Sequence, residues 1–392
     1  MSFEPLASDF YGFETLLTDQ EKEAIARLRS YLEERVRPVI GDYWERAEFP
    51  RDLIPSFLET DVARFPFAEV RPFENSAVFR GLVSMEMSRV DASMSTFVGV
   101  QEGLAMGSIN VCGSQEQRDE WLPRMASGEV IGAFGLTEPL SGSDSARGLR
   151  TTATRQGDSW VLNGSKRWIG NATFSDITVI WAKDTADGQV KGFIVPTSTP
   201  GYRATKIERK QALRIVQNAD IVLEDVRVPE SLRLQNANSF RDTAAVLRLT
   251  RAEVAWAAVG VAIGAYEAAL AYATERIQFG KPIASHQLVQ QHLAEMMGGI
   301  TASVALCTRV SQMLDEGTQK DEHAALAKAF ATARMRETVA RAREVMGGNG
   351  IVLDYDVTRF FNDAEALYSY EGTREMNTLI VGRALTGKAA FV

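Results

Sequence analysis

Four short runs of sequence set the architecture of this chain: WVLNGSKRWIG (160–170), DITVIWAK (176–183), VKGFIVP (190–196) and ADIVLEDVRVP (219–229). They are rich in Val, Ile, Trp and Phe, and Asn-Gly, Asp-Gly and Pro mark turns within and between them. We interpret Asn163-Gly164 as a hairpin turn, because these two residue types accept the positive φ that such a turn requires. Short strands at this spacing predict a small β-barrel or sandwich.

Helical patterns flank this region on both sides. From Thr18 to Ile40 apolar residues recur at steps of three and four, and Thr18 followed by Glu21 is a typical helix start. Further helices are predicted at 77–106, 114–128, 244–275, 285–315, 320–346 and after Gly372. The chain is therefore predicted to be an α+β protein with an N-terminal α-helical domain (1–130), a β-barrel domain (131–236) and a C-terminal α-helical bundle (237–392).

The composition excludes several classes of protein. The 392 residues carry a net charge of −8 with a pI near 5.2, which argues against a nucleic-acid partner because such proteins present a basic face. The N-terminus lacks a basic start followed by an apolar run, and no stretch is expected to be long and apolar enough to cross a membrane. A cytoplasmic location is the expectation.

The cysteines and histidines give no sign of a metal centre. Cys112 and Cys307 are isolated, which disfavours disulfides and structural zinc and fits a reducing compartment. His286 and His292 are six residues apart, so they do not share one helical face. No metal is expected.

Two patches in the central region depart from plain core or surface patterning. Phe134–Pro139 and Ser141–Asp144 (FGLTEP, SGSD) form a Gly/Ser-rich loop that offers N–H groups and hydroxyls to a phosphate or flavin edge. Arg167–Asn171 (RWIGN) places a Trp beside a Gly, where the indole could stack on a ring system. Each pattern alone fits an ordinary turn, or a buried strand Trp, equally well.

Three further patches lie in the C-terminal region. Arg276–Pro282 (RIQFGKP) combines a cation, an amide and an aromatic at a helix exit, which suits a flat anionic ligand. Met346–Gly350 (MGGNG) has more glycines than a helix end needs, which indicates close approach to a ligand or another chain. Tyr368–Thr373 (YSYEGT) places Glu371 among aromatics, where burial would raise its pKa and make it a base. By itself, such a Glu is more often a solvated helix-start residue.

Together, the five patches occur in an order that resembles the acyl-CoA dehydrogenase family: LTEPxSGSD, WIxN, RxQFGKP, GGNG and YEGT. The resemblance covers roughly Leu17 to Phe391. Within the family the chain looks most like the glutaryl-CoA dehydrogenase branch, which also resembles the plant peroxisomal short-chain acyl-CoA oxidases. The resemblance implies a helical domain, a β-barrel and a C-terminal four-helix bundle, assembled as a homotetramer, with FAD bound between barrel and bundle and shared between subunits.

The resemblance also implies roles for individual residues. Glu371 would be the catalytic base, and Arg251, Ser95 and Gly372 would lie at the acyl-CoA. The FAD contacts would be Phe134, Leu136, Thr137, Ser143, Trp168, Gly170, Thr373 and Glu375, and, for the FAD of the adjacent subunit, Arg276, Gln278, Phe279, Glu344 and Gly348. In this family the glutamate removes the α-proton, the β-hydrogen leaves as hydride to flavin N5, and a trans-2-enoyl-CoA forms.

Two departures from the family pattern bear on acceptor and substrate. Gly170 stands where the family commonly has Thr or Ser, which removes a polar contact, leaves space near flavin N5 and makes O₂ a credible electron acceptor. Ser95 stands where glutaryl-CoA dehydrogenases have an arginine for the distal carboxylate, and a buried carboxylate without a cation is costly. We therefore expect an uncharged short or branched acyl chain rather than a glutaryl chain.

Several alternatives stay open at this point. The electron acceptor is expected to be an electron-transfer flavoprotein, or O₂ if the protein is a short-chain acyl-CoA oxidase. Glutaryl-CoA dehydrogenase proper is a further alternative. Flavin monooxygenases and nitroalkane oxidases of this fold generally lack the glutamate, so Glu371 counts against them. A flavin-free helical scaffold would have no reason to keep the five motifs together. Acyl chain length, pathway and the choice between dimer and tetramer are not determined by the sequence.

Overall fold

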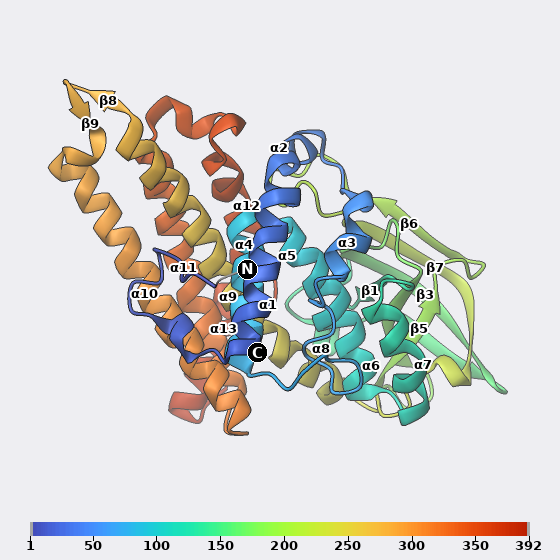
Figure 1. The fold of residues 1–392 in the computed structure, drawn as a ribbon. Coiled ribbons are helices and arrows are strands. Elements are labelled where there is room, and N and C mark those ends of the chain that lie inside the picture. The colour runs from blue at the N-terminus through green and yellow to red at the C-terminus, as the bar shows by residue number, and fades with distance from the viewer. Residues whose placement is uncertain (1–2, 390–392) are drawn as a thin grey trace.

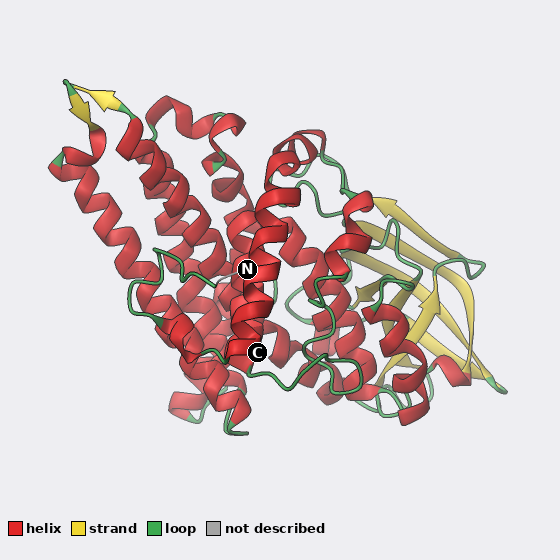
Figure 2. Ribbon diagram, viewed as in Figure 1, coloured by secondary structure: helices red, strands yellow, loops and turns green. Residues whose placement is uncertain are grey.

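The computed structural model describes residues 3–389, and its elements follow the order helices, strands, helices. Figure 1 shows the first helices standing between the C-terminal helices and the sheet, so the sheet and the bundle flank the N-terminal domain. In Figure 2 the strands gather on one side as a curled sheet, while the rest of the molecule is helical. The α–β–α order predicted from the sequence is confirmed.

The N-terminal domain consists of helices that pack into one continuous core with the bundle. The α-helices are α1 (Asp19–Tyr31), α2 (Arg37–Arg46), α3 (Ile54–Leu58), α4 (Ala77–Val90), α5 (Ala92–Val98), α6 (Gly107–Cys112) and α7 (Gln115–Ala126), with π-helical segments η2 (Leu32–Val36) and η4 (Gly99–Met106). Thr18 accepts the backbone N–H of Glu21, and the Glu21 side chain bonds back, so the predicted helix start is a complete capping box.

The Arg89-Val90-Asp91 run ends α4 and connects it to the neighbouring helices. Arg89 forms ion pairs with Glu33 (2.6 Å), Glu86 (3.0 Å) and Glu267 (2.9 Å), which tie α4 to η2 and to the bundle. Asp91 caps α5 by accepting the N–H groups of the residues two and three positions on. These contacts fix the start of α5, the helix that carries Ser95.

Within the described residues, the middle domain is one seven-stranded sheet and the short helix α8 (Ser145–Gly148). The strands are β1 (Gly132–Gly135), β2 (Thr152–Gln156), β3 (Ser159–Ile169), β4 (Ile177–Asp184), β5 (Val190–Pro196), β6 (Tyr202–Lys206) and β7 (Ala219–Pro229). β4 pairs in parallel with β1 and β2 and antiparallel with β5, and the order β2–β3–β7–β6 is antiparallel. The sheet has a core of its own around Trp160 and Phe193.

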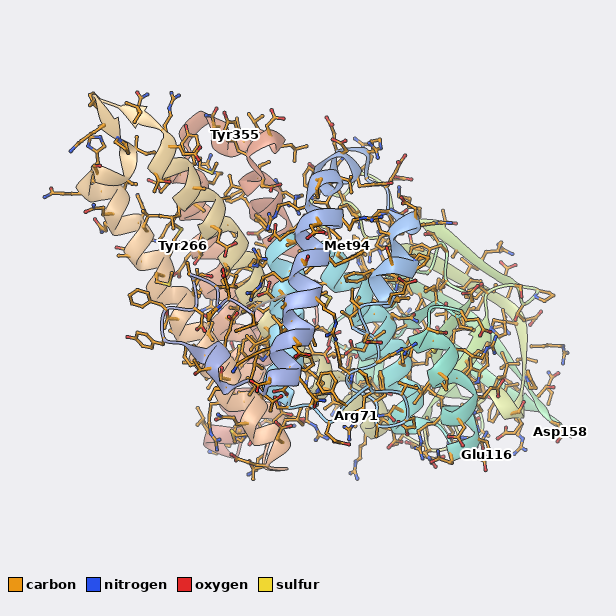
Figure 3. The ribbon with its side chains drawn as sticks, in the orientation of Figure 1. Arg71, Met94, Glu116, Asp158, Tyr266 and Tyr355 are labelled. Carbon is orange, nitrogen blue, oxygen red and sulfur yellow. The ribbon has the colours of Figure 1, made fainter. Side chains whose placement is uncertain are left out.

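The hairpin predicted at Asn163-Gly164 was wrong, because both residues lie inside β3. The β2–β3 turn lies instead at Gly157-Asp158, and Figure 3 shows Asp158 at the outer tip of the sheet. The Asn163 side chain bonds across to Asp225 of β7, and the pairing is irregular there. Gly164 passes Thr151 so closely that a Cβ would stand 2.7 Å from its Cα, so this glycine serves close packing at a bulge.

The C-terminal region is a bundle of long helices. They are α9 (Phe240–Glu275), α10 (Gln287–Asp315), α11 (Asp321–Val345), α12 (Val357–Ser369) and α13 (Arg374–Thr386), and a two-stranded hairpin, β8 (Ile277–Gln278) and β9 (Lys281–Pro282), joins α9 to α10. α12 lies outside the helices predicted from the sequence. α9 packs against α4, α10 and α11 and is the central helix of the core.

One expectation about membrane crossing needs correction. Within residues 3–389, α9 contains an 18-residue window with a mean hydropathy of 1.6, which is long and apolar enough to cross a membrane by length and composition. In the fold, 72% of that window is buried. The apolar composition of α9 is thus used to pack against its neighbours.

Candidate active site

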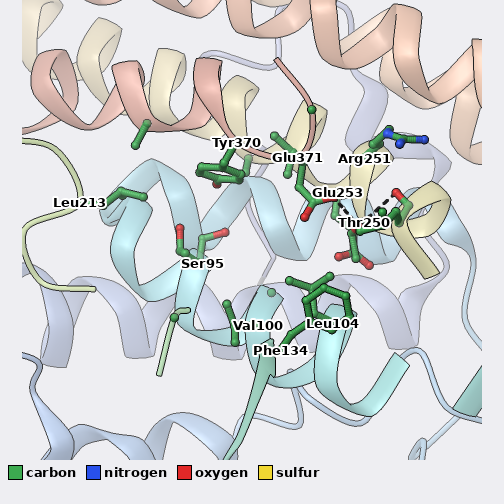
Figure 4. A pocket seen from close by; sticks show the side chains of 18 of the residues that line it. Ser95, Val100, Leu104, Phe134, Leu213, Thr250, Arg251, Glu253, Tyr370 and Glu371 are labelled. Carbon is green, nitrogen blue, oxygen red and sulfur yellow. Dashed lines mark hydrogen bonds between the residues drawn. The ribbon is translucent and has the colours of Figure 1, made fainter. Parts of the chain in front are cut away.

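A cavity of about 780 Å³ lies where the three domains meet. Its wall comes from α4, α5 and η4, from β1 and the loop after it, from α9, and from the loop between α12 and α13. Figure 4 shows Tyr370 and Glu371 entering from that last loop, while Thr250, Arg251 and Glu253 come from α9 and Ser95 from α5. The wall is mostly apolar, which favours an apolar ligand segment with a few polar contacts.

Glu371 is held in an unusual backbone conformation. Its φ is +53°, a left-handed value that costs a non-glycine residue about 1–3 kcal/mol, and Gly372 follows at +80°. The carboxylate accepts a hydrogen bond from the Thr250 hydroxyl at 2.8 Å. Burial raises the pKa of Glu371, whereas the Thr250 hydrogen bond and the charges of Arg251 and Lys328 lower it in part. The result is a partly buried carboxylate whose pKa is raised, in the direction that favours action as a base.

One buried amine and one buried side-chain amide hold the loop that carries this base. Lys328 of α11 donates from Nζ to the carbonyls of Tyr368 (2.9 Å) and Gly372 (2.8 Å). Asn377 of α13 donates to the same Gly372 carbonyl at 2.9 Å. Burial lowers the pKa of Lys328 to about 8, with the charge of Glu371 acting in the opposite direction. The clamp holds the strained conformation in place, so Lys328 is a positioning residue.

Many of the predicted site residues meet at this cavity. Its wall contains Ser95, Phe134, Leu136, Thr137, Ser143, Trp168, Gly170, Arg251, Glu371, Gly372 and Thr373. They come from sequence positions as far apart as 95 and 373, and the fold alone brings them together. Their roles toward FAD and acyl-CoA stay predictions.

The loop after β1 is fixed by a buried ion pair. Lys166 is fully buried and donates from Nζ to Glu138 (2.9 Å) and to the carbonyls of Leu136 (3.2 Å) and Trp181 (2.7 Å). Glu138 also accepts two backbone N–H groups and the Thr151 hydroxyl. Burial lowers the pKa of Lys166 to about 8, and the charge of Glu138 offsets part of that effect. This pair orients Leu136 and Thr137 toward the cavity.

Gly170 is less open than the sequence suggested. A Cβ at this position would stand 3.0 Å from a methyl group of Val100, so part of the expected free space is filled. Trp168, two residues earlier, has φ +65° and is 52% exposed, which leaves its indole available to a flat ligand.

The remaining predicted residues lie away from this cavity. Arg276, Gln278, Phe279, Glu344, Gly348 and Glu375 are not part of its wall. Figure 1 shows the β8–β9 hairpin at the opposite end of the molecule from the sheet. Phe279 at its tip is 94% exposed, an unusual state for an aromatic side chain. These residues do not complete the cavity of their own chain.

The GGNG motif is partly explained within the chain. Gly347 has φ +58° just after α11, as a helix C-cap requires, and Gly350 approaches the Arg343 carbonyl, which a Cβ would meet at 2.4 Å. Gly347 and Gly348 both face open space, but the positive φ of Gly347 already accounts for the glycine there. The prediction of an external partner therefore rests on Gly348 alone.

Comparison with known proteins identifies the family. The acyl-CoA dehydrogenase N-terminal domain matches residues 18–129, the middle domain 133–226 and the C-terminal domain 240–386. An acyl-CoA dehydrogenase of Bacillus subtilis (strain 168) is 32% identical over 365 residues, covering 92% of this chain and 96% of the relative. The chain belongs to the acyl-CoA dehydrogenase family.

Solved structures of this family share the whole fold. Glutaryl-CoA dehydrogenase from Mycobacterium smegmatis is similar with a TM-score of 0.94 at 40% identity, covering 99% of this chain and 100% of that one. A glutaryl-CoA dehydrogenase of the same organism, in complex with FADH2, has a TM-score of 0.94 at 36% identity and 98% coverage of both chains. The resemblance seen in the five motifs is confirmed.

Sequence reasoning missed four residues of this acyl-CoA dehydrogenase site. Thr250, Glu253, Lys328 and Glu102 all touch the cavity or the base-bearing loop. For three of the four the available signal was a charge inside a mostly apolar run: Glu253 in LTRAEVAWAAVG, Lys328 in ALAKAFATA and Glu102 in VGVQEGLAMG. Thr250 carried no such signal. Such a charge must find a partner or a function, because it cannot simply face solvent.

Proposed function

We propose that this member of the acyl-CoA dehydrogenase family removes the α-proton of a short-chain or branched acyl-CoA with Glu371 and yields the trans-2-enoyl-CoA. The supporting observation is the Glu371 carboxylate itself, held by Thr250 and the Lys328 clamp in an apolar cavity. A carboxylate with a raised pKa in such a place is costly for stability and useful as a base.

The residues around the cavity fit an FAD. The Thr137 and Ser143 hydroxyls form no hydrogen bond in the described part of the chain and stand in the cavity wall, as donors to a flavin or phosphate would. The half-exposed Trp168 offers its indole to the ring. FAD, when bound, supplies the acceptor for the β-hydrogen, which leaves as hydride.

The chain's own groups would stabilise the thioester enolate. In residues 3–389 the Glu371 backbone N–H donates no hydrogen bond, so it is available to the carbonyl oxygen that gains negative charge. The buried Nε of Arg251 also lacks a partner there and lies on the cavity wall. Both unsatisfied donors are expected to be paired when acyl-CoA is bound.

We further propose that a second copy of the chain completes the FAD site. The exposed Phe279 forms an aromatic and cationic tip together with Arg276 and Gln278. None of these three residues lines the cavity of its own chain. A homotetramer would bury this tip against a neighbour. An electron-transfer flavoprotein is the proposed acceptor, and the packing of Val100 against Gly170 weakens the case for O₂.

The test is anaerobic mixing of the purified yellow protein with butyryl-, isobutyryl- and glutaryl-CoA, followed at the flavin absorbance and then opened to air. We expect bleaching by an uncharged chain that persists in air. Rapid return of colour with peroxide would instead indicate an oxidase, and bleaching chiefly by glutaryl-CoA would contradict the argument from Ser95. A colourless protein would contradict the flavin assignment.

The pH dependence follows from the state of the base. Glu371 acts as the carboxylate, so kcat/KM falls as the pH drops through its raised pKa. Thr250→Val removes the hydrogen bond that lowers this pKa, and the acid limb is expected to move to higher pH with little loss on the plateau. Other charged groups also face this region: Arg251 and Glu253 on α9, Glu102 on η4 and Lys328 on α11. The acid limb of the pH profile therefore reports the titration of Glu371 together with these groups.

The matched control for this variant is Thr274→Val. Thr274 lies exposed on the same helix and bonds the carbonyl three residues back, as Thr250 also does. An unchanged acid limb in Thr250→Val, or an equal shift in the control, would contradict the proposed contact.

A further inference from the structure

Two carboxylates that the proposed reaction does not use face the substrate cavity. Glu253 lies on α9 one turn after Thr250, and Glu102 lies on η4. The Glu253 carboxylate fills the place of a missing side chain at Gly103, where a Cβ would be 2.7 Å from its Oε2. Figure 4 shows Glu253 beside Thr250 and Glu371. The base and a second carboxylate therefore share one end of the cavity.

Neither carboxylate has a partner in the described residues. No hydrogen bond or ion pair reaches the side chain of Glu102 or Glu253, and the Ser84 hydroxyl bonds only the Glu253 backbone carbonyl. Arg80 is the cation that acts on both, but its guanidinium is bound to Asn75 at 2.9 Å and pairs with Asp315 at 3.7 Å. Glu102 and Glu253 are partly buried in the cavity wall, and two neighbouring carboxylates without a committed cation are costly in such a place.

The energetics agree with that geometry. Burial raises the pKa of Glu253 to about 7, Arg80 lowers it in part, and the charge of Glu371 raises it further. Burial and the charge of Glu253 raise the pKa of Glu102 well above its usual value. An arrangement that destabilises its own charges points to a ligand that compensates them.

A ligand that compensates two negative charges is a cation, and the residues of the cavity wall indicate which kind of cation fits. No group of three or more His, Cys, Asp or Glu in residues 3–389 has a geometry that would hold a metal ion. The cavity wall that contains the two carboxylates is mostly apolar, and Val83, Met87 and Leu104 belong to it together with the polar Arg80 and Ser84. Apolar walls around paired carboxylates suit an organic cation that carries methylene or methyl groups.

We propose that the acyl chain taken by this cavity carries an amino or trimethylammonium group at its far end, held between Glu102 and Glu253. This inference rests on the proposed function and revises the expectation of an uncharged chain. Glu253 follows Thr250 by one helical turn, about 5 Å along α9, which corresponds to roughly three or four carbon atoms between thioester and cation. The same carboxylates would repel the distal carboxylate of a glutaryl chain.

The test uses two acyl thioesters of equal shape and different charge: 4-(trimethylammonio)butanoyl-CoA and its neutral isostere 5,5-dimethylhexanoyl-CoA. Flavin reduction by the FAD-loaded wild-type protein is measured with each, with butyryl-CoA as reference. We expect kcat/KM for the cation to exceed that for the isostere by about tenfold or more, because only the cation pairs with the carboxylates. A neutral isostere that is used equally well or better would overturn the inference.

Variants locate the effect within the cavity. In Glu253→Gln and Glu102→Gln the ratio of kcat/KM for the cation to kcat/KM for the neutral isostere is expected to fall about tenfold, and the flavin-to-protein absorbance ratio of each variant reports an intact fold. Glu120→Gln removes an exposed carboxylate on α7 and should keep the wild-type preference. An unchanged preference in both cavity variants would overturn the inference. Absence of flavin reduction by all three thioesters would instead overturn the proposed function.

Discussion

Glu371→Gln is expected to lower the turnover of any accepted acyl-CoA by at least ~100-fold while FAD content stays at the wild-type level. Gln keeps the size of the side chain and an oxygen that accepts from the Thr250 hydroxyl, so the 2.8 Å contact is preserved. What is lost is the ability to take a proton. The strained backbone at Glu371 is also retained, because Lys328 and Asn377 hold the Gly372 carbonyl and not the side chain.

The measurement is steady-state turnover together with the flavin-to-protein absorbance ratio. A second readout follows exchange of the α-hydrogens of bound acyl-CoA with D₂O by NMR, which reports proton removal separately from oxidation. Glu120→Gln, an exposed carboxylate on α7, is the control for loss of one negative charge. Near-normal turnover or α-hydrogen exchange in Glu371→Gln would remove this residue from the mechanism.

Lys166→Met is expected to reduce the free energy of unfolding by about 3–5 kcal/mol, the usual effect of breaking a buried ion pair. Lys166 and Glu138 are both buried, so the variant leaves a charged carboxylate without its cation. The carbonyls of Leu136 and Trp181 lose their donor as well. Because Leu136 belongs to the loop at the cavity, FAD content should also fall.

Urea unfolding followed by tryptophan fluorescence measures this effect, with comparison at the transition midpoint. The double variant Lys166→Met/Glu138→Gln should recover much of the loss, because no uncompensated charge remains. Arg203→Met is the matched control: it breaks the exposed Arg203–Glu224 pair, for which a loss below about 1 kcal/mol is expected. A loss in Lys166→Met no larger than in that control would contradict the structural role of the pair.

Local patterns predicted the elements well where the determinants are near one another in sequence. The capping box at Thr18 and the helical periodicity of α9 could both be recognised in the sequence, since caps and helical stripes involve residues three or four apart. The predicted turn at Asn163-Gly164 was wrong because its determinants are distant in sequence. Its conformation is set by Asp225 on β7 and by Thr151 just before β2, and a rule that uses only neighbouring residues in sequence does not include them.

The sequence by itself determined the family, the helix–strand–helix order and the identity of the candidate base, because ordered motifs and periodicity are properties of the chain. Only the tertiary structure decided that Glu371 lies against Thr250, that Lys328 clamps its loop, and that Glu102 and Glu253 share its cavity. A lone charge in an apolar run does not reveal its environment. Its pKa and its partners depend on desolvation and on groups distant in sequence, 40 residues away for Lys328 and Tyr368 and 121 for Thr250 and Glu371, which only folding brings together.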